Sequence, residues 1–376
     1  MILRRACLAL LILLGILVGQ ARADDVVDGR FGPGALYRLV RPTNWNGSLV
    51  VYAHGYVYPD QPVAITPDDA LVISLLAPQG FAVAVSSFSE NGWVIKDGSQ
   101  RTHQLLGLFT SKFGQPTAVY VGGASMGGLI AIKLVEMYPG TYAGALAACA
   151  ASGGTQRLAD YRAHARALFD FFYPGVLPGS PVDLPAGTDV TQDIVLPANA
   201  AMTANLSPAF AMAAVDQTPF PFATPAELVE SIITALVSNA GDLAQLRSLT
   251  NGHPYFDNRS TNYSSATLPA PLLQAINAGI DRFDASPSAL QAFEHNYDPS
   301  GDLRLPMLML SDARDPVVPG FNQVSYAAAV AANGAADFLV QRQVQAFGHC
   351  VFTPAQLGSA FSDLVLWVQF GIKPTP

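Results

Sequence analysis

A serine in this sequence lies in a setting typical of a catalytic nucleophile. Ser125 is the centre of the G-x-S-x-G run at residues 123–127, which follows an apolar, strand-like segment and precedes a helix-like one. A tight turn between a strand and a helix needs glycine wherever a Cβ would clash, so Gly123 and Gly127 fit this context. The turn would hold the Ser125 hydroxyl out at the carboxyl end of a sheet. A hydroxyl is a weak nucleophile until a base takes its proton, so partners are required.

His349 is the histidine that best fits the base. Where a G-x-S-x-G turn carries the nucleophile, an acid and then a histidine follow it along the chain. His349 follows the last strand-like segment and precedes the C-terminal helical segment. The other five histidines precede the serine or fall in the middle of the chain: His54, His103, His164, His253 and His295.

Two aspartates compete for the acid that orients the base. Asp315 lies deeper in the loop after an apolar strand, with Pro316 stiffening the backbone behind it. Asp312 lies at the start of that loop, where it could form a turn or pair with Arg314. We therefore predict Asp315 as the catalytic acid and keep Asp312 as the alternative.

Backbone N–H groups must hold the charge that develops on the substrate oxygen. We expect one from Met126, directly after the serine, and the other from Tyr56, in the loop after the first inner strand. His54, in the same loop, is interpreted as a brace rather than a second base. Phe88 and Trp93 follow another strand and are candidates for the substrate pocket, although simple packing explains them equally well.

The cysteines indicate a disulfide. Cys7 lies in an N-terminal leader, which leaves Cys149 and Cys350 as an even pair in an oxidising compartment. Two buried free thiols are the alternative. No C-x-x-C or clustered Cys/His spacing occurs, so we predict no metal site.

The leader itself reads as a secretory signal peptide over residues 1–23. It has an early arginine pair, an apolar stretch at 6–18 and a small-residue end at 21–23. We therefore expect a secreted or periplasmic protein. Cleavage removes three arginines and no acids, so the net charge changes from −8 to −11, which argues against nucleic acid and anionic membranes as partners.

Composition points to a large apolar core. Of the 376 residues, 50% are hydrophobic and only 13% are charged, which disfavours disorder and coiled coil. Mean hydropathy is +0.29, but a spanning helix needs about 20 consecutive apolar residues, which the chain after the leader lacks. No membrane insertion is expected.

Alternating strand-like and helix-like segments predict an α/β fold with a mainly parallel central sheet flanked by helices. Strands are expected at 36–40, 49–53, 81–86, 118–122, 144–148, 306–311 and 338–344, and helices at 68–77, 101–113, 127–138, 321–332 and 354–370. The alternation breaks over residues 152–301, where helical pieces are expected at 225–238 and 242–249. We predict a catalytic core of residues 24–151 and 302–376, interrupted at 152–301 by a mainly helical lid.

The sequence resembles the α/β-hydrolase superfamily at four places. These are the strand-to-helix turn around Ser125, the His54-Gly55 loop, the stretch from Asp315 to Pro319, and residues 348–350. Within it, the chain looks like secreted bacterial serine esterases and peptidases that carry a lid. The resemblance covers about residues 36–151 and 302–372. It implies an eight-stranded sheet and a triad of Ser125, Asp315 and His349 that needs no cofactor. The loop at His54 lacks the His-Gly-Gly-Gly run of many lipases, which speaks against a hormone-sensitive-type lipase.

These observations predict a secreted carboxylic ester hydrolase that works through an acyl-serine intermediate. Its partner would be a small or polymeric ester, and the oligomeric state is left open. A peptidase on the same fold is the alternative, with an acid available to hold the substrate ammonium: Glu90, Glu227, Glu230 or Glu294. A non-catalytic binding module would be expected to have lost the serine or the histidine, and both are present.

Overall fold

The computed structural model describes residues 24–296 and 298–376, so the predicted signal peptide and Cys7 lie outside the described residues. The strands are β1 (Asp25–Phe31), β2 (Ala35–Arg41), β3 (Ser48–Ala53), β4 (Ala82–Ser86), β5 (Ala118–Ala124), β6 (Gly144–Ala148), β7 (Met307–Arg314) and β8 (Leu339–Phe347). The α-helices are α1 (Pro67–Leu76), α2 (Ile95–Phe113), α3 (Met126–Met137), α4 (Thr155–Phe172), α5 (Leu196–Ala204), α6 (Ser207–Ala213), α7 (Pro225–Leu249), α8 (Ala270–Gly279), α9 (Pro287–Asn296), α10 (Phe321–Ala332) and α11 (Pro354–Phe370).

The eight strands form one mixed sheet. Their order is β1-β2-β4-β3-β5-β6-β7-β8, in which β2 runs antiparallel to both β1 and β4 and the strands from β4 to β8 run parallel. This order, with a strand-to-helix turn after the central strand β5, is that of the α/β-hydrolase fold. The predicted fold class is confirmed.

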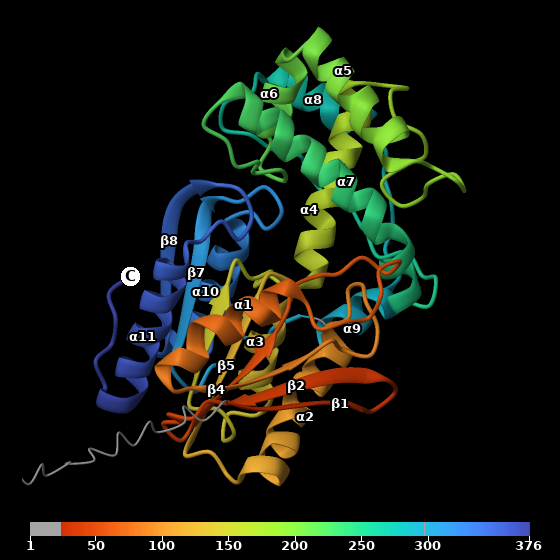
Figure 1. Ribbon diagram of the computed structural model, residues 1–376. Helices are drawn as coiled ribbons and strands as arrows, with labels where there is room; N and C mark the ends of the chain where they lie inside the picture. The colour runs from red at the N-terminus through yellow and green to blue at the C-terminus, as the bar shows by residue number, and fades with distance from the viewer. Residues whose placement is uncertain (1–23, 297) are drawn as a thin grey trace, which may run out of the picture.

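Helices cover both faces of the sheet, which explains its continuous apolar strands. Every residue of β3 and β4 is buried, as expected for strands packed on both sides. One face packs against α1 and α11 through residues such as Val50, Leu76 and Leu364. The other packs against α2 and α3, which lie on the opposite side of the sheet (Figure 1).

The predicted core elements are all present, with changes at their ends. β6, α10 and α11 have the predicted bounds, whereas α2 begins at Ile95 rather than at residue 101. β1 was not among the predicted strands, because its residues alternate between exposed and half-buried instead of forming an apolar run. It pairs along its whole length with β2 as an edge hairpin.

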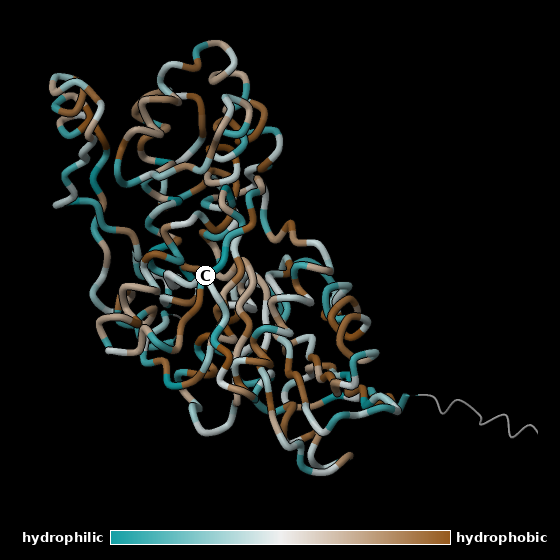
Figure 2. The backbone as a smooth tube through the Cα atoms, turned by 90° about the vertical axis from the view of Figure 1, so that its left-hand side faces the viewer, coloured by the Kyte–Doolittle hydropathy of each residue, from teal (hydrophilic) through white to brown (hydrophobic). Residues whose placement is uncertain are grey.

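Helices α4 to α9 occupy the stretch between β6 and β7. Figure 1 shows α5, α6 and α8 far from the sheet, with α4 and α7 leading to them, whereas α9 lies beside the sheet. α7 is one continuous helix where the sequence suggested two pieces, since Gly241 is an exposed position that a helix tolerates. Figure 2 shows apolar segments in these helices as well as in the sheet. Among the described residues, no helix combines the length and apolarity that crossing a membrane requires.

Candidate active site

The turn between β5 and α3 holds Ser125 in a backbone conformation that side chains rarely adopt, with φ of 55° and ψ of −120°. The two glycines of the motif are required by contacts. A Cβ on Gly127 would lie 2.0 Å from the carbonyl oxygen of Ala53, and a Cβ on Gly123 would lie 2.0 Å from that of Gly127. Gly127 therefore lies so close to the end of β3, and Gly123 so close to Gly127, that only glycine fits at either position.

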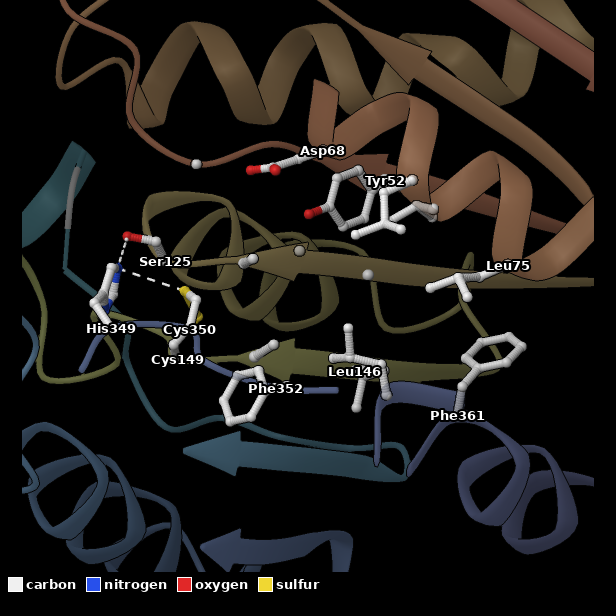
Figure 3. Close-up of a pocket in the computed structure, with 18 of the residues that line it drawn as sticks. Tyr52, Asp68, Leu75, Ser125, Leu146, Cys149, His349, Cys350, Phe352 and Phe361 are labelled. Carbon is white, nitrogen blue, oxygen red and sulfur yellow. Dashed lines mark hydrogen bonds between the residues drawn. A yellow bond between two sulfur atoms is a disulfide. The ribbon is translucent and has the colours of Figure 1, made fainter. Parts of the chain in front are cut away.

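Ser125, His349 and Asp315 form a chain of hydrogen bonds. His349 Nε2 lies 2.8 Å from Ser125 Oγ (Figure 3). His349 Nδ1 lies 2.6 Å from Asp315 Oδ2. Because an ionised carboxylate only accepts hydrogen bonds, Nδ1 carries the proton in this contact and Nε2 is free to accept from the serine hydroxyl. This is the tautomer that a general base for Ser125 requires.

Backbone groups fix the carboxylate that orients His349. Asp315 is almost fully buried, and its Oδ1 accepts hydrogen bonds from the N–H groups of Val317 and Val318, both at 2.9 Å. The loop after β7 therefore folds back on the acid. With one oxygen held by the backbone, the other faces the imidazole.

Asp312, the alternative acid, has a different set of contacts. It is buried at the end of β7, and its Oδ2 accepts a hydrogen bond from the Val351 N–H at 3.2 Å. Burial raises the pKa of Asp312 to about 6. Arg314, its other suggested partner, pairs with Glu227 of α7 at 3.1 Å. Asp312 thus braces the backbone after His349, whereas Asp315 contacts the imidazole itself.

A disulfide joins Cys149, just after β6, to Cys350, the neighbour of His349, with 5.3 Å between their Cα atoms. Both cysteines have positive φ, 41° and 57°. Cys350 Sγ lies 3.5 Å from His349 Nε2. The bridge therefore ties the loop that carries the histidine to the end of a central strand. Its sulfur atoms are bonded to each other, so they are not the thiolates that bind metals.

The expected oxyanion donors lie on either side of the serine. Met126 begins α3, where the first N–H groups of a helix have no partner within it. Tyr56 follows Gly55, and a Cβ on Gly55 would make an ordinary contact with Ser125 Cβ at 3.5 Å. His54 donates from Nδ1 to the Gly55 carbonyl at 2.7 Å, which matches its interpretation as a brace.

An apolar groove with a volume of about 450 Å³ begins at Ser125. Its floor is formed by β3, β5 and β6, and its walls by α1 and α11. Figure 3 shows Ser125 and His349 at one end and Leu75 and Phe361 at the other. Asp68 is the acid that lines it. The groove residues on α1 and α11 were not singled out from the sequence, because apolar residues on helices beside a sheet usually fill the core.

The prediction that Phe88 and Trp93 line the pocket is wrong. Phe88 is fully buried and stacks on the His54 ring, with centroids 3.9 Å apart. The indole N–H of Trp93 donates to Thr155 Oγ1 at 2.8 Å. Neither residue lines the groove, because Phe88 packs against His54 and Trp93 packs against the start of α4. Both side chains instead pack in the interior, which was the alternative explanation of these residues.

Helices of the insertion contact both loops that flank the serine. Gln245 of α7 donates from Nε2 to Tyr56 Oη at 2.5 Å and accepts from the Trp93 N–H at 2.7 Å. Arg162 of α4 pairs with Asp242 of α7 and donates to the Val317 carbonyl at 3.5 Å. The loop that contains Tyr56 and the loop that contains Val317 are thereby linked to the same pair of helices. Sequence patterns gave no signal for these contacts.

The acids suggested for a peptidase do not line the groove. Glu227 pairs with Arg314, as described above, and also accepts a hydrogen bond from the Ala223 N–H at 2.6 Å. The other three, Glu90, Glu230 and Glu294, are not among the groove residues. A substrate ammonium would therefore find only Asp68 in the groove.

Neither the protein-family models nor the curated proteins include a match to this sequence. Among solved structures, similar chains include an esterase of Pyrococcus furiosus (12% identity, TM-score 0.46, covering 91% of this chain and 90% of that one). Another is feruloyl esterase B from Aspergillus oryzae (16%, 0.48, 93% and 80%). A third is an acylaminoacyl peptidase of Pyrococcus horikoshii (9%, 0.46, 96% and 43%). These chains share little sequence with this one, so its function must be inferred from its own residues.

Proposed function

We propose that this protein is a secreted serine hydrolase that cleaves carboxylic esters through an acyl-serine intermediate. One observation carries the proposal: the continuous hydrogen-bonded chain from Ser125 through His349 to Asp315, at the end of an apolar groove. Nucleophile, base and orienting acid are the three parts that acyl transfer by serine requires.

In the proposed reaction, Ser125 Oγ attacks the ester carbonyl carbon while His349 Nε2 takes the hydroxyl proton. The carbonyl π electrons move onto the oxygen, where the N–H groups of Tyr56 and Met126 would hold the charge. The tetrahedral intermediate collapses, the C–O bond to the alcohol breaks, and the alcohol oxygen takes the proton from Nε2. Water then gives a proton to the same nitrogen and attacks the acyl carbon. The bond to Ser125 Oγ breaks, Oγ takes the proton back from Nε2, and the acid is released.

Asp315 contributes by holding the imidazole. Its carboxylate keeps the proton on Nδ1 and stabilises the imidazolium that forms when Nε2 takes the serine proton. The two backbone N–H groups on Oδ1 fix the carboxylate in advance, so little rearrangement is needed during the reaction.

Substitution of the nucleophile tests the proposal. Ser125→Ala should lower kcat for p-nitrophenyl esters by about a million-fold, the scale observed when a serine nucleophile is removed. Circular dichroism and thermal unfolding would show whether the variant still folds. A folded Ser125→Ala protein with undiminished activity would contradict the proposal.

A peptidase is the second candidate. Since the same groups attack amides, aminoacyl-arylamides should be assayed beside acyl esters. The apolar lining of the groove and the structural pairing of Glu227 favour esters. Hydrolysis of arylamides with a kcat/KM above that of the esters would reverse this preference.

We further propose that residues 24–151 and 302–376 form the catalytic core, that 152–301 act as its lid, and that 1–23 are removed on export. The disulfide beside His349 is compatible with an oxidising compartment. Contacts of Gln245 and Arg162 with the catalytic loops support a lid that bears on the site. N-terminal sequencing of the exported protein should find Asp24 as the first residue, and a start at Met1 would oppose cleavage.

A further inference from the structure

We propose that the groove beside Ser125 binds the acyl part of the ester as an extended, unbranched hydrocarbon chain, and that Gly122 sets how deep this chain reaches. The inference rests on the proposed ester hydrolysis and adds a substrate class to it. It follows from the shape of the groove, its lining and the position of one glycine.

The groove is a slot between two helices and the sheet. Its floor contains Val50 and Tyr52 of β3, Gly122 of β5 and Leu146 of β6. Leu71, Val72 and Leu75 of α1 form one wall, while Leu357 and Phe361 of α11 lie on the other side. Val50 pairs with Tyr120 in the sheet, five residues before Ser125. At about 3.3 Å per residue, the slot extends about 16 Å from the nucleophile.

Gly122 is where a side chain is missing from the floor. A Cβ there would lie 3.6 Å from the Tyr52 ring and 3.8 Å from the Leu146 carbonyl oxygen, both ordinary contacts. Its backbone does not adopt a left-handed conformation. Geometry therefore does not demand glycine at this position, in contrast to Gly123 and Gly127. The effect of Gly122 is to leave room in the groove.

The position of His349 assigns the groove to the acyl part. The alcohol must leave beside His349 Nε2, because it takes its proton from that atom. In Figure 3 the groove runs from Ser125 toward Leu75 and Phe361, away from the imidazole. The acyl group, which remains bonded to Ser125 until water arrives, is thus the part that lies along the groove.

The lining selects apolar chains. Aliphatic and aromatic side chains make up most of it, and Leu71 is 44% exposed along its edge. Apart from Ser125 and His349 at its end, its polar side chains are Asp68 and three tyrosines, Tyr52, Tyr56 and Tyr58. An acyl chain that ends in a carboxylate would have to bury its charge without a lysine or arginine among the groove residues, so dicarboxylic esters should be poor substrates.

A series of p-nitrophenyl esters from acetate to palmitate tests this assignment on the mature protein. We expect kcat/KM to rise by about three- to fourfold per added methylene until the groove is full. A parallel series of acetate esters with lengthening alkyl alcohols should show no such rise. If the rise follows the alcohol instead, the assignment of the groove to the acyl part is wrong.

Variants at different positions along the groove test how far the acyl chain extends from Ser125. Gly122→Val should lower the ratio of kcat/KM for decanoate to kcat/KM for acetate by about tenfold or more, since valine suits a strand and fills the floor. Leu75→Trp, at the far end, should affect only the longest chains. Gly122→Ala should have a smaller effect in the same direction. Gly107→Ala, on an exposed site of α2 with nothing within 4 Å, is its matched control.

The outcomes separate this inference from the function on which it rests. If the wild type hydrolyses short esters but has a flat acyl-length profile, or if Gly122→Val lowers every chain length equally, the acyl groove is wrong and the esterase stands. If the folded protein hydrolyses no ester and reacts with no fluorophosphonate, the proposed function itself fails.

Discussion

The loops that carry Ser125, Asp315 and His349 and the groove beside them are built in different ways. Around Ser125 and Asp315, backbone contacts leave little choice of residue. A Cβ on either glycine of the turn would clash with a carbonyl oxygen, and two backbone N–H groups hold the Asp315 carboxylate. A disulfide joins the loop that carries His349 to the end of β6. In the groove, apolar side chains of ordinary helices and strands surround a space that Gly122 leaves open. Reacting atoms need fixed positions, whereas a hydrocarbon chain needs only room and an apolar lining.

The sharpest contrast should come from the two aspartates of the loop after β7. Asp315→Asn should lower kcat by about 10⁴-fold, because an amide in this place favours the wrong imidazole tautomer. Asp312→Asn, only three residues away, should change kcat by less than about tenfold, since Asp312 contacts backbone rather than the imidazole. Steady-state kinetics of both variants would decide. Equal losses would mean that the two acids share the role.

Glycine-to-alanine substitutions compare the two regions by stability. Gly127→Ala should lower the free energy of unfolding by about 3 kcal/mol or more, because its Cβ would meet the Ala53 carbonyl oxygen. Gly122→Ala should raise it by about 0.5 kcal/mol, because alanine restricts the unfolded chain and has room here. Urea unfolding measures both. A stable Gly127→Ala protein would show that the turn around Ser125 is less constrained than its contacts indicate.

Removal of the disulfide tests how the histidine loop is held. The double variant Cys149→Ser/Cys350→Ser should lose about 2–4 kcal/mol of unfolding free energy. A fall in kcat without a change in KM for short esters would indicate that the bridge positions His349, and the acyl-length profile should keep its shape. Unchanged kcat in the folded double variant would limit the bridge to stability.

The last prediction concerns the pH dependence of stability. The pKa of Asp312 is raised by burial from 3.8 to about 6, so the folded state binds a proton more tightly than the unfolded state does. The contribution of this group to stability is therefore fully present below about pH 4 and is lost as pH rises toward about 6. Asp312→Asn should be more stable than the wild type by about 1 kcal/mol at pH 8, with no such advantage at pH 4. Equal stability gains at both pH values would exclude ionisation as the cause.

Most of the core could be predicted because its strands are buried on both faces and read as continuous apolar runs. Ser125, His349 and Asp315 could be selected from motif and chain order, and their hydrogen bonds follow from loops at one edge of the sheet. β1 was not predicted, because the residues of this edge strand alternate between half-buried and exposed and form no apolar run.

Sequence patterns could not predict the groove or the contacts that α4 and α7 make with the loops near Ser125. Phe88 and Trp93 follow a strand end, as pocket residues often do, yet they pack inward, because sequence does not reveal how a loop folds. From the sequence, Leu75 is indistinguishable from a leucine of the core, because the sequence does not show the groove beside it. The hydrogen bonds of Gln245 join residues more than a hundred positions apart, and no local signal marks them.

Labelling with a fluorophosphonate tests the central claim most directly. The folded wild-type protein should gain the mass of one phosphonyl group, on the peptide that contains Ser125, and should lose ester hydrolysis in parallel. The Ser125→Ala variant should gain none. Absence of labelling in an ester-hydrolysing wild type, or labelling at a different serine together with loss of activity, would contradict the assignment of Ser125 as the nucleophile.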